Sequence, residues 1–221
     1  MRRIIIICEG ETEQAFCKTM LNPYFAGKGL YIQSPLIKQT RGGITNWSNL
    51  KAQIENYMKE DRAVFVSLLI DYYGIEQKHN FPAWEESLHI VNKNERLDFL
   101  EQKMQEDIAP ELRHRFIPYM QLHEFEGLLF NHINIFHEQI PAADLVNLPE
   151  LQNTFEQFSN PEMINDCPET VPSKRLGRII RGYNKIVYGN ILAEAIGLVK
   201  IRNKCQRFNA WIGKIESKCT T

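Results

Sequence analysis

The sequence predicts an α/β protein with a mostly parallel sheet, helices on both of its faces and a helical C-terminal region. Short, continuous apolar runs at residues 3–8, 63–71 and 115–122 are typical of strands buried on both faces. Segments with the periodicity of amphipathic helices lie between these runs. The resulting order, β-α-β-α-β-α-β followed by helices, indicates parallel strands joined by helical crossovers.

The first two strands and the helix between them are predicted for residues 1–37. Residues 3–8 are β-branched and wholly apolar, apart from the flanking arginines and Cys8. The next stretch predicts a helix that begins near Thr12 and ends before Pro23, because proline interrupts a helix interior. Residues 30–37 predict a second strand, and Pro35 within it favours a position at an edge of the sheet or at a bulge.

Two further helix–strand units complete the predicted sheet. A loop over residues 40–49 leads into a helix at 46–61, whose apolar residues share one face, and then into the strongest strand, 63–71. A loop separates this strand from a helix at 96–108, and residues 115–122 form the last strand.

The rest of the chain reads as helical. Residues 125–136 predict a buried helix, and residues 138–172 predict short helices between loops. A basic, partly helical segment at 173–189 precedes a long helical segment that is broken near Gly197. We therefore expect an α/β core at 1–135 and a helical, basic region at 136–221 that packs on the core in one compact unit.

Composition places the chain among ordinary globular proteins: it has 221 residues, 43% of them hydrophobic and 24% charged. No apolar run approaches the roughly 20 residues that span a bilayer, so no membrane partner is expected. The N-terminal apolar run is too short, and too closely followed by acids, for a signal peptide, which favours the cytoplasm.

The net charge of −1 hides a strong asymmetry along the chain. Residues 173–221 hold eleven Lys or Arg against two Glu, whereas residues 1–172 hold fifteen against twenty-five acids. This pattern predicts either a basic surface for a phosphate backbone or a solvated basic helix that packs on the acidic part.

Acidic residues follow three of the predicted strands: Glu9, Asp71 and Glu124. Parallel strands end at the same edge of a sheet, where open α/β sheets place their chemistry, so these carboxylates can converge. Gathered carboxylates repel one another unless a cation neutralises them, and their hard oxygens suit Mg²⁺ or Mn²⁺. For Glu9 the alternative is a structural role at the start of the following helix, where the helix dipole favours acids.

These residues resemble a known family. The block "CEGETEQAF" and a later strand ending in "LIDYYG" are similar to the TOPRIM fold of primases, topoisomerases and OLD-type nucleases. That resemblance implies a glutamate after the first strand, matched by Glu9, and a DxD pair after a later one, matched at its first position by Asp71. Tyr73 stands where the second aspartate is expected, which departs from the family pattern.

The resemblance can be narrowed to the TOPRIM-like DUF4276 (domain of unknown function) family. Blocks that carry it run from residue 8 to residue 212 and include "FIPYMQLHEFEGLLF", "PSKRLGRIIRGYNKIVYG" and "IRNKCQRFNAWI". The resemblance implies a component of a bacterial anti-phage system that works beside an ABC-type ATPase.

The "LHEFEG" stretch offers a replacement for the missing acid. Glu124 and Glu126 are separated by one residue and face one side if the backbone is extended. If a helix starts at Phe125, they diverge by about 200° and only one reaches the metal. We favour Glu124 as the nearer ligand, Glu126 as a ligand or a supporting residue, and Glu13 as a further ligand. His123 is expected to be structural.

A basic block supplies the cations that a site for nucleic acid needs, because clustered carboxylates alone repel phosphate. Pro172 marks a helix start, and free N–H groups at a helix start bind anions. We expect phosphate contacts from this block: Ser173, Lys174, Arg175, Arg178 and Lys185. A second basic cluster is expected to be a solvated or partner-binding face: Lys200, Arg202, Lys204 and Arg207.

The sequence thus predicts a Mg²⁺- or Mn²⁺-dependent nuclease, or a nuclease-like phosphoryl-transfer protein, that acts on DNA or RNA. Glu9, Asp71, Glu124 and Lys174 are the expected catalytic residues. The alternative is a non-catalytic TOPRIM-like scaffold that binds an ATPase partner or a nucleic acid, and Tyr73 in place of an acid is its best support.

Overall fold

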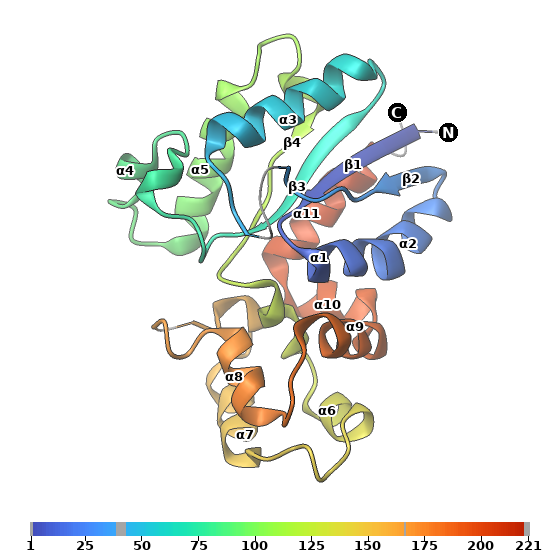
Figure 1. The fold of residues 1–221 in the computed structure, drawn as a ribbon, viewed down its shortest axis with the longest axis vertical. Helices are drawn as coiled ribbons and strands as arrows, with labels where there is room; N and C mark the ends of the chain where they lie inside the picture. The colour runs from blue at the N-terminus through green and yellow to red at the C-terminus, as the bar shows by residue number, and fades with distance from the viewer. Residues whose placement is uncertain (1, 39–42, 166, 219–221) are drawn as a thin grey trace.

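A parallel sheet forms the centre of the computed structural model, which describes residues 2–38, 43–165 and 167–218 (Figure 1). Its strands follow the order β2-β1-β3-β4, and β5 pairs with β3 further along that strand. Every pairing between these strands is parallel, as predicted. The strand bounds are β1 Arg2–Cys8, β2 Leu30–Gln33, β3 Phe65–Asp71, β4 Phe116–Ile117 and β5 Met120–Gln121.

Both faces of the sheet are buried, which explains why its central strands are apolar without alternation. In β1, Ile4 and Ile6 belong to one core cluster, and Ile5 and Ile7 belong to the other. Successive side chains of a strand point to opposite faces, so four consecutive isoleucines supply both cores at once. The edge position predicted from Pro35 is confirmed, because β2 is the outermost strand beside β1.

Helices cover the two faces as predicted (Figure 1). On one face, α3 (Trp47–Glu60) and α5 (Lys93–Asp107) pack against β1 and β3. On the other face lie α1 (Glu11–Phe16), α9 (Lys185–Ile196) and α11 (Gln206–Glu216). A buried hydrogen bond of 2.8 Å from Trp211 Nε1 to Ser67 Oγ joins α11 to the middle of β3.

Two prolines act differently from the prediction. The first helical run starts at Glu11 and continues beyond Pro23 to Ala26, through a π-helical turn, η1 (Cys17–Leu21), and α2 (Asn22–Ala26). Pro23 lies in the first turn of α2, where its missing N–H removes no helical hydrogen bond. Pro118 divides the last predicted strand into β4 and β5, because it cannot donate to the ladder.

The segment after β5 is less helical than predicted. A 3₁₀ helix, η4 (Phe125–Leu129), precedes α6 (Ile133–Gln139), with a break between them. The remaining new elements are η2 (Gln77–His79), α4 (Trp84–Ser87), η3 (Arg113–Arg115), α7 (Leu148–Gln157), η5 (Pro161–Met163), α8 (Pro172–Ile179) and α10 (Leu198–Lys204). Part of the loop predicted at 40–49 lies outside the described residues.

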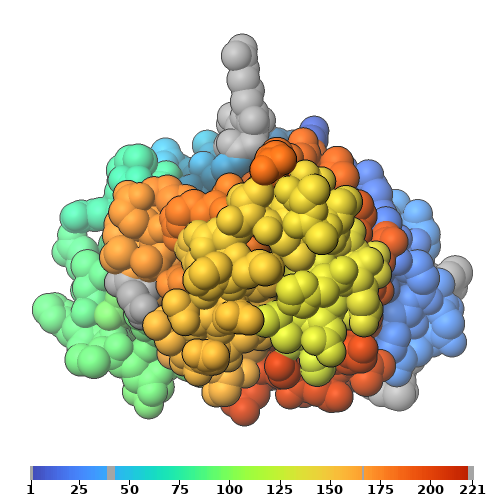
Figure 2. Space-filling view, turned by 90° about the horizontal axis from the view of Figure 1, so that it is seen from below, coloured from blue at the N-terminus to red at the C-terminus, as the bar shows by residue number. Residues whose placement is uncertain are grey.

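The helices α6, α7 and α8 lie together at the end of the molecule away from the sheet, and their yellow and orange surface occupies the centre of the view in Figure 2. The predicted break near Gly197 separates α9 from α10, and a φ of +80° at this residue favours glycine. In the part of the chain that the structure describes, no helix has the length and apolar character required to cross a membrane.

Of the second basic cluster, Lys200 is exposed as expected for a solvated face, whereas the other three cations have partners within the protein. Arg202 forms an ion pair with Glu216 at 2.9 Å, and Lys204 donates to a backbone carbonyl near α6. Arg207 is buried against the sheet and pairs with Glu101 of α5. These cations therefore join the C-terminal helices to the core, because neighbouring segments place acids and carbonyl groups beside them.

Candidate functional site

The carboxyl edge of the sheet brings Glu9 and Asp71 together. β1 and β3 are parallel neighbours with Cys8 opposite Leu69, so the residues after Cys8 and at the end of β3 meet at one edge. The Glu9 side chain crosses to the neighbouring strand, where its Oε2 accepts a hydrogen bond of 2.9 Å from Asp71 N. Parallel pairing therefore places an acid from the start of the chain beside one that is 62 residues later.

The buried segment after β5 closes the same edge from the other side. Asp71 Oδ1 accepts a hydrogen bond of 2.9 Å from Phe125 N, at the start of η4. Glu124 has an extended backbone and Phe125 begins the 3₁₀ turn, so the side chains of Glu124 and Glu126 diverge. This is the second of the two arrangements expected from the sequence, in which a helix starts at Phe125 and the two side chains diverge.

Glu124 and Glu126 have different partners, although the pKa of Glu9 is raised by burial first and then by the charges of both. Glu124 accepts hydrogen bonds from Ser173 N at 2.8 Å and Ser173 Oγ at 3.0 Å, and so holds the first turn of α8. Glu126 is fully buried, and Lys185 Nζ lies 2.9 Å from its Oε1. Its Oε2 has no hydrogen-bond partner in the structure as described. The preference for Glu124 as the nearer ligand stays a prediction, and both oxygens of Glu124 already accept hydrogen bonds from Ser173.

Glu13 folds back from α1 toward the turn after β1. Its Oε2 accepts a hydrogen bond of 3.0 Å from Gly10 N, and the side chain is buried. A Cβ atom at position 10 would stand 3.1 Å from the same oxygen, so glycine permits this close approach. Glu11, by contrast, is exposed, as expected for the solvent side of the first helical turn.

These acids surround a pocket of about 700 Å³. Its wall includes the acids Glu9, Glu13 and Asp71 and also Lys185. The other lining residues are Gly10, Glu11, Thr12, Leu36, Gly43 and Ile186. Glu126 does not line this pocket but pairs with Lys185, which does.

Burial and mutual repulsion raise the pKa of every acid in the cluster. Burial is the largest cause for Glu9 and Asp71, and the neighbouring carboxylates add to it. The pKa of Glu126 is also raised, by burial first. Burial, Glu126 and Glu9 together raise the pKa of Glu13 to about 7. Clustered carboxylates hold protons in this way when too little positive charge is nearby.

Lys185 is the cation that forms an ion pair with this cluster. Burial alone would lower its pKa, but the charge of Glu126 and of further carboxylates outweighs that effect and raises it. Among the described residues, Lys185 is the one cation within salt-bridge distance of Glu9, Glu13, Asp71 or Glu126. One positive charge thus faces four carboxylates.

The donor set fits a hard divalent cation. Its oxygens are carboxylates, the local charge is unbalanced, and Glu126 Oε2 is buried without a partner. The ligands are not preassembled, since no group of three or more His, Cys, Asp or Glu in the described ranges is arranged to hold a metal ion. Backbone N–H groups and Lys185 occupy one oxygen each of Glu9, Glu13, Asp71 and Glu126 instead.

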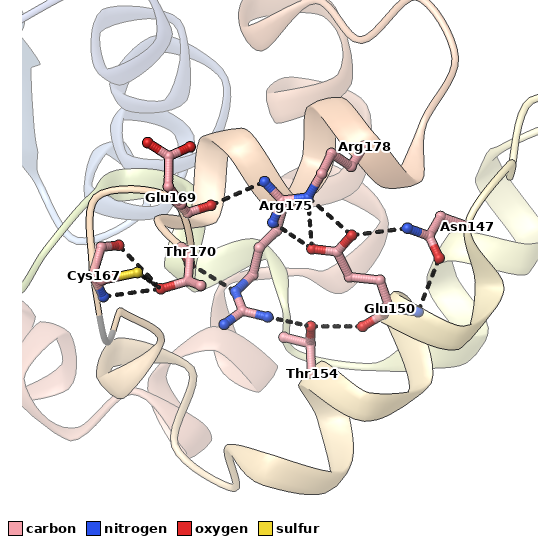
Figure 3. A network of polar contacts seen from close by, with 8 residues as sticks. All are labelled: Asn147, Glu150, Thr154, Cys167, Glu169, Thr170, Arg175 and Arg178. Atoms are coloured by element: carbon pink, nitrogen blue, oxygen red, sulfur yellow. Dashed lines mark hydrogen bonds and ion pairs between the residues drawn. The ribbon is translucent and has the colours of Figure 1, made fainter.

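Arg175 is not among the residues that line the pocket. Its guanidinium is buried, donates to Thr170 O at 2.7 Å and to Thr154 Oγ1 at 3.2 Å (Figure 3), and lies over the ring of Phe158. These contacts join α8 to α7 and to the preceding loop. The expected phosphate contact of Arg175 is replaced by a structural role, because the buried face of α8 carries this side chain.

The neighbouring cations of α8 are also paired within the protein. Arg178 pairs with Glu150 of α7 and donates to Glu169 O at 2.9 Å (Figure 3). Lys174 is exposed and lies 3.2 Å from Glu169 Oε1. Of the five residues expected to bind phosphate, Lys185 lines the pocket, and Ser173 adjoins the site through Glu124.

His123 and Tyr183 complete the surroundings. His123 is buried with a φ of +68°, and burial and then Lys93 lower its pKa to about 4. A neutral, packed imidazole agrees with the structural role expected for it. Tyr183 was not singled out as a site residue from the sequence, yet burial and then Glu126 raise its pKa, and its hydroxyl has no partner within the described structure. Its position two residues before Lys185 is the sequence feature that could have indicated a place near the site.

Comparison with known proteins gives one family. A family model described as "Domain of unknown function (DUF4276)" matches residues 8–216. No curated protein and no solved structure matches the chain.

Proposed function

The chain belongs to the DUF4276 family, a domain of unknown function, and we propose that it is a metal-dependent nuclease or nuclease-like phosphoryl-transfer protein. In this proposal the fold is related to the TOPRIM domains of OLD-type nucleases, and the reaction takes place at the carboxyl edge of the sheet. The substrate is DNA or RNA, and the protein works in the cytoplasm.

The observation that carries the proposal is the excess of buried carboxylate over positive charge in and beside one pocket. Glu9, Glu13, Asp71 and Glu126 all have raised pKa values, and Lys185 pairs with a single oxygen among them. Burying several carboxylates beside a single positive charge lowers the free energy of unfolding. A binding site for a cation gives a functional reason for that cost.

Each acid has a distinct place in the proposed site. Glu9, Asp71 and Glu126 would hold Mg²⁺ or Mn²⁺, with Glu13 as an additional ligand. The bound ion would supply an activated water and offset charge on the phosphoryl group. Glu9 lines the pocket and has a raised pKa, so it is also placed to accept a proton there. Glu124 would act by positioning α8 through Ser173.

The cationic side of the site is smaller than the sequence indicated. Lys185 is the lysine that lines the pocket, and exposed Lys174 can reach a phosphate backbone only by leaving Glu169. With so few cations at the pocket, part of the phosphate-binding surface would come from a partner. The ABC-type ATPase implied by the family resemblance, in an anti-phage system, is the partner we propose.

Two measurements test the proposal. Mn²⁺ binding to the purified protein should have micromolar to millimolar affinity and should be lost in Glu9→Gln. Mixed single- and double-stranded DNA and RNA should then be cleaved with Mg²⁺ or Mn²⁺, by the protein alone or together with an ABC-type ATPase of the kind that the family resemblance implies. Absence of Mn²⁺ binding, or cleavage that survives Glu9→Gln, would contradict the proposal.

The second candidate is a non-catalytic scaffold. It is favoured by the lack of a preassembled metal-binding group among the described residues and by Tyr73, which is 39% exposed where the TOPRIM pattern has an acid. In that case the pocket would be neutralised by protons and by Lys185. The scaffold should associate with the ATPase or with nucleic acid equally well in the presence of a chelator.

A further inference from the structure

We propose that Lys185 is a built-in counter-ion of the acidic pocket, which a divalent cation must displace before the site can act. This inference rests on the proposed metal-dependent function and adds a regulatory step to it. In the resting state, the ammonium group neutralises Glu126. When the cation binds, the same ammonium group is released to the pocket, where it can contact a phosphate oxygen of the substrate.

The position of Lys185 in its helix indicates that the acids, and not the helix, account for its presence. Lys185 is the first residue of α9, and the Asn184 side chain caps this helix by accepting from Ile186 N and Val187 N. A positive charge at a helix N-terminus opposes the helix dipole, which favours acids there. The contact with Glu126 supplies the compensating interaction.

The backbone of Lys185 is held in place, while half of its side chain is exposed to solvent. Gly189, one turn further along α9, packs so closely on α1 that a Cβ atom would stand 3.1 Å from Thr12 Cγ2. This contact fixes the start of α9 beside the helix that carries Glu13. The Lys185 side chain is 50% exposed, whereas Glu126 is fully buried, so the ammonium reaches inward from solvent to its partner.

Charge and geometry both favour exchange with a divalent ion. Lys185 contacts Glu126 Oε1, while Glu126 Oε2 remains without a partner within the described structure. A divalent cation carries twice the charge and binds six or more oxygens, so it can contact several carboxylates that one ammonium cannot. The two cations compete for the same buried carboxylate.

The lysine is also suited to a second contact after release. It lines the pocket together with Glu9 and Asp71, and its stem is long and flexible. Its positive charge then lies at the rim, where a phosphate oxygen would approach the metal. The proposed order is therefore cation first and nucleic acid second, which keeps the lysine paired until the site is loaded.

The test compares Mn²⁺ affinity in the wild type, Lys185→Met and Lys185→Arg, measured by calorimetry on the full chain, with Lys200→Met as the control at another exposed lysine. Lys185→Met removes the competing charge and should bind Mn²⁺ about fivefold more tightly or better, the scale of one partly exposed ion pair. Lys185→Arg keeps the charge and should bind like the wild type, and so should Lys200→Met. Circular dichroism confirms that each variant is folded.

The outcomes separate this inference from the proposed function. Wild-type binding with equal or weaker binding by Lys185→Met would overturn the counter-ion role and leave the metal site standing. Binding by Lys185→Met alone would overturn the proposed exchange, because Mn²⁺ would then be unable to displace the lysine in the wild type. If neither protein binds Mn²⁺ while both are folded, the metal-dependent function fails and the inference fails with it.

Discussion

Replacing Glu9 with glutamine separates a functional role of this acid from a structural one. The Glu9 side chain accepts a hydrogen bond of 2.9 Å from Asp71 N, and the amide oxygen of glutamine can accept the same bond. The shape of the site is therefore kept. What is lost is one negative charge from a cluster in which burial and the neighbouring carboxylates already raise the pKa of Glu9.

The size of the effect follows from ligand linkage. A ligand at 100 times its dissociation constant stabilises the native state by about 2.7 kcal/mol. For a chain of this length, 1 kcal/mol shifts the melting temperature by roughly 2–4 °C, so Mn²⁺ should raise the wild-type Tm by about 5–10 °C. In Glu9→Gln this increment should largely vanish. The metal-free Tm should hold or rise, because fewer buried carboxylates repel one another. Nuclease activity should fall by at least about 10².

Thermal unfolding at several Mn²⁺ concentrations and constant ionic strength measures how much Mn²⁺ raises the Tm. Glu60→Gln is the matched control, since Glu60 carries the same charge, is exposed and does not line the pocket. It should behave like the wild type in both assays. The reasoning would be refuted if Glu9→Gln lowered the metal-free Tm but kept its Mn²⁺ increment and its activity per folded molecule. Glu9 would then only support the turn between β1 and α1.

Three other perturbations test the electrostatics and the packing around the site. Burial and the nearby Glu126 and Glu9 raise the pKa of Glu13 to about 7, so the metal-free native state holds a proton that the unfolded chain releases above about 4.5. Stability in urea should therefore decrease as pH rises from about 4.5 to 7, by at most about 3 kcal/mol from this group, and Glu13→Gln should flatten the profile. Ser67→Ala leaves the buried indole N–H of Trp211 without its acceptor, and should cost about 1–3 kcal/mol in urea unfolding; a smaller loss would mean that the indole finds another partner. Arg175→Ala should cost about 2 kcal/mol or more, because a buried guanidinium and its hydrogen bonds are lost, whereas exposed Lys174→Ala should change stability by less than about 0.5 kcal/mol. Equal effects of these two substitutions would contradict the structural role of Arg175.

Local sequence patterns were sufficient to predict the architecture and to bring together the two acids of the candidate site that lie at strand ends. A continuous apolar run such as residues 3–8 is typical of a strand buried on both faces, so it predicts a parallel sheet between two layers of helices. The edge position of β2 follows from Pro35, and the break after α9 from Gly197. Glu9 and Asp71 come together because parallel strands share one carboxyl edge, a rule that needs only their positions at strand ends.

Only the tertiary structure decided which of the remaining charges belong to the site. Glu124 and Glu126 look equivalent in the sequence, and a 3₁₀ turn beginning at Phe125 separates them, sending one to Ser173 and the other to Lys185. Arginine commonly binds phosphate, but Arg175 lies on the buried face of α8 and therefore has a structural role. The physical reason is that the hydrophobic periodicity that predicts a helix or strand is a property of a short segment. The partner of a charged residue, by contrast, depends on which distant segments fold against it. Lys185 and Glu126 are 59 positions apart in the sequence, and only the packing of α9 against the sheet edge makes them a pair.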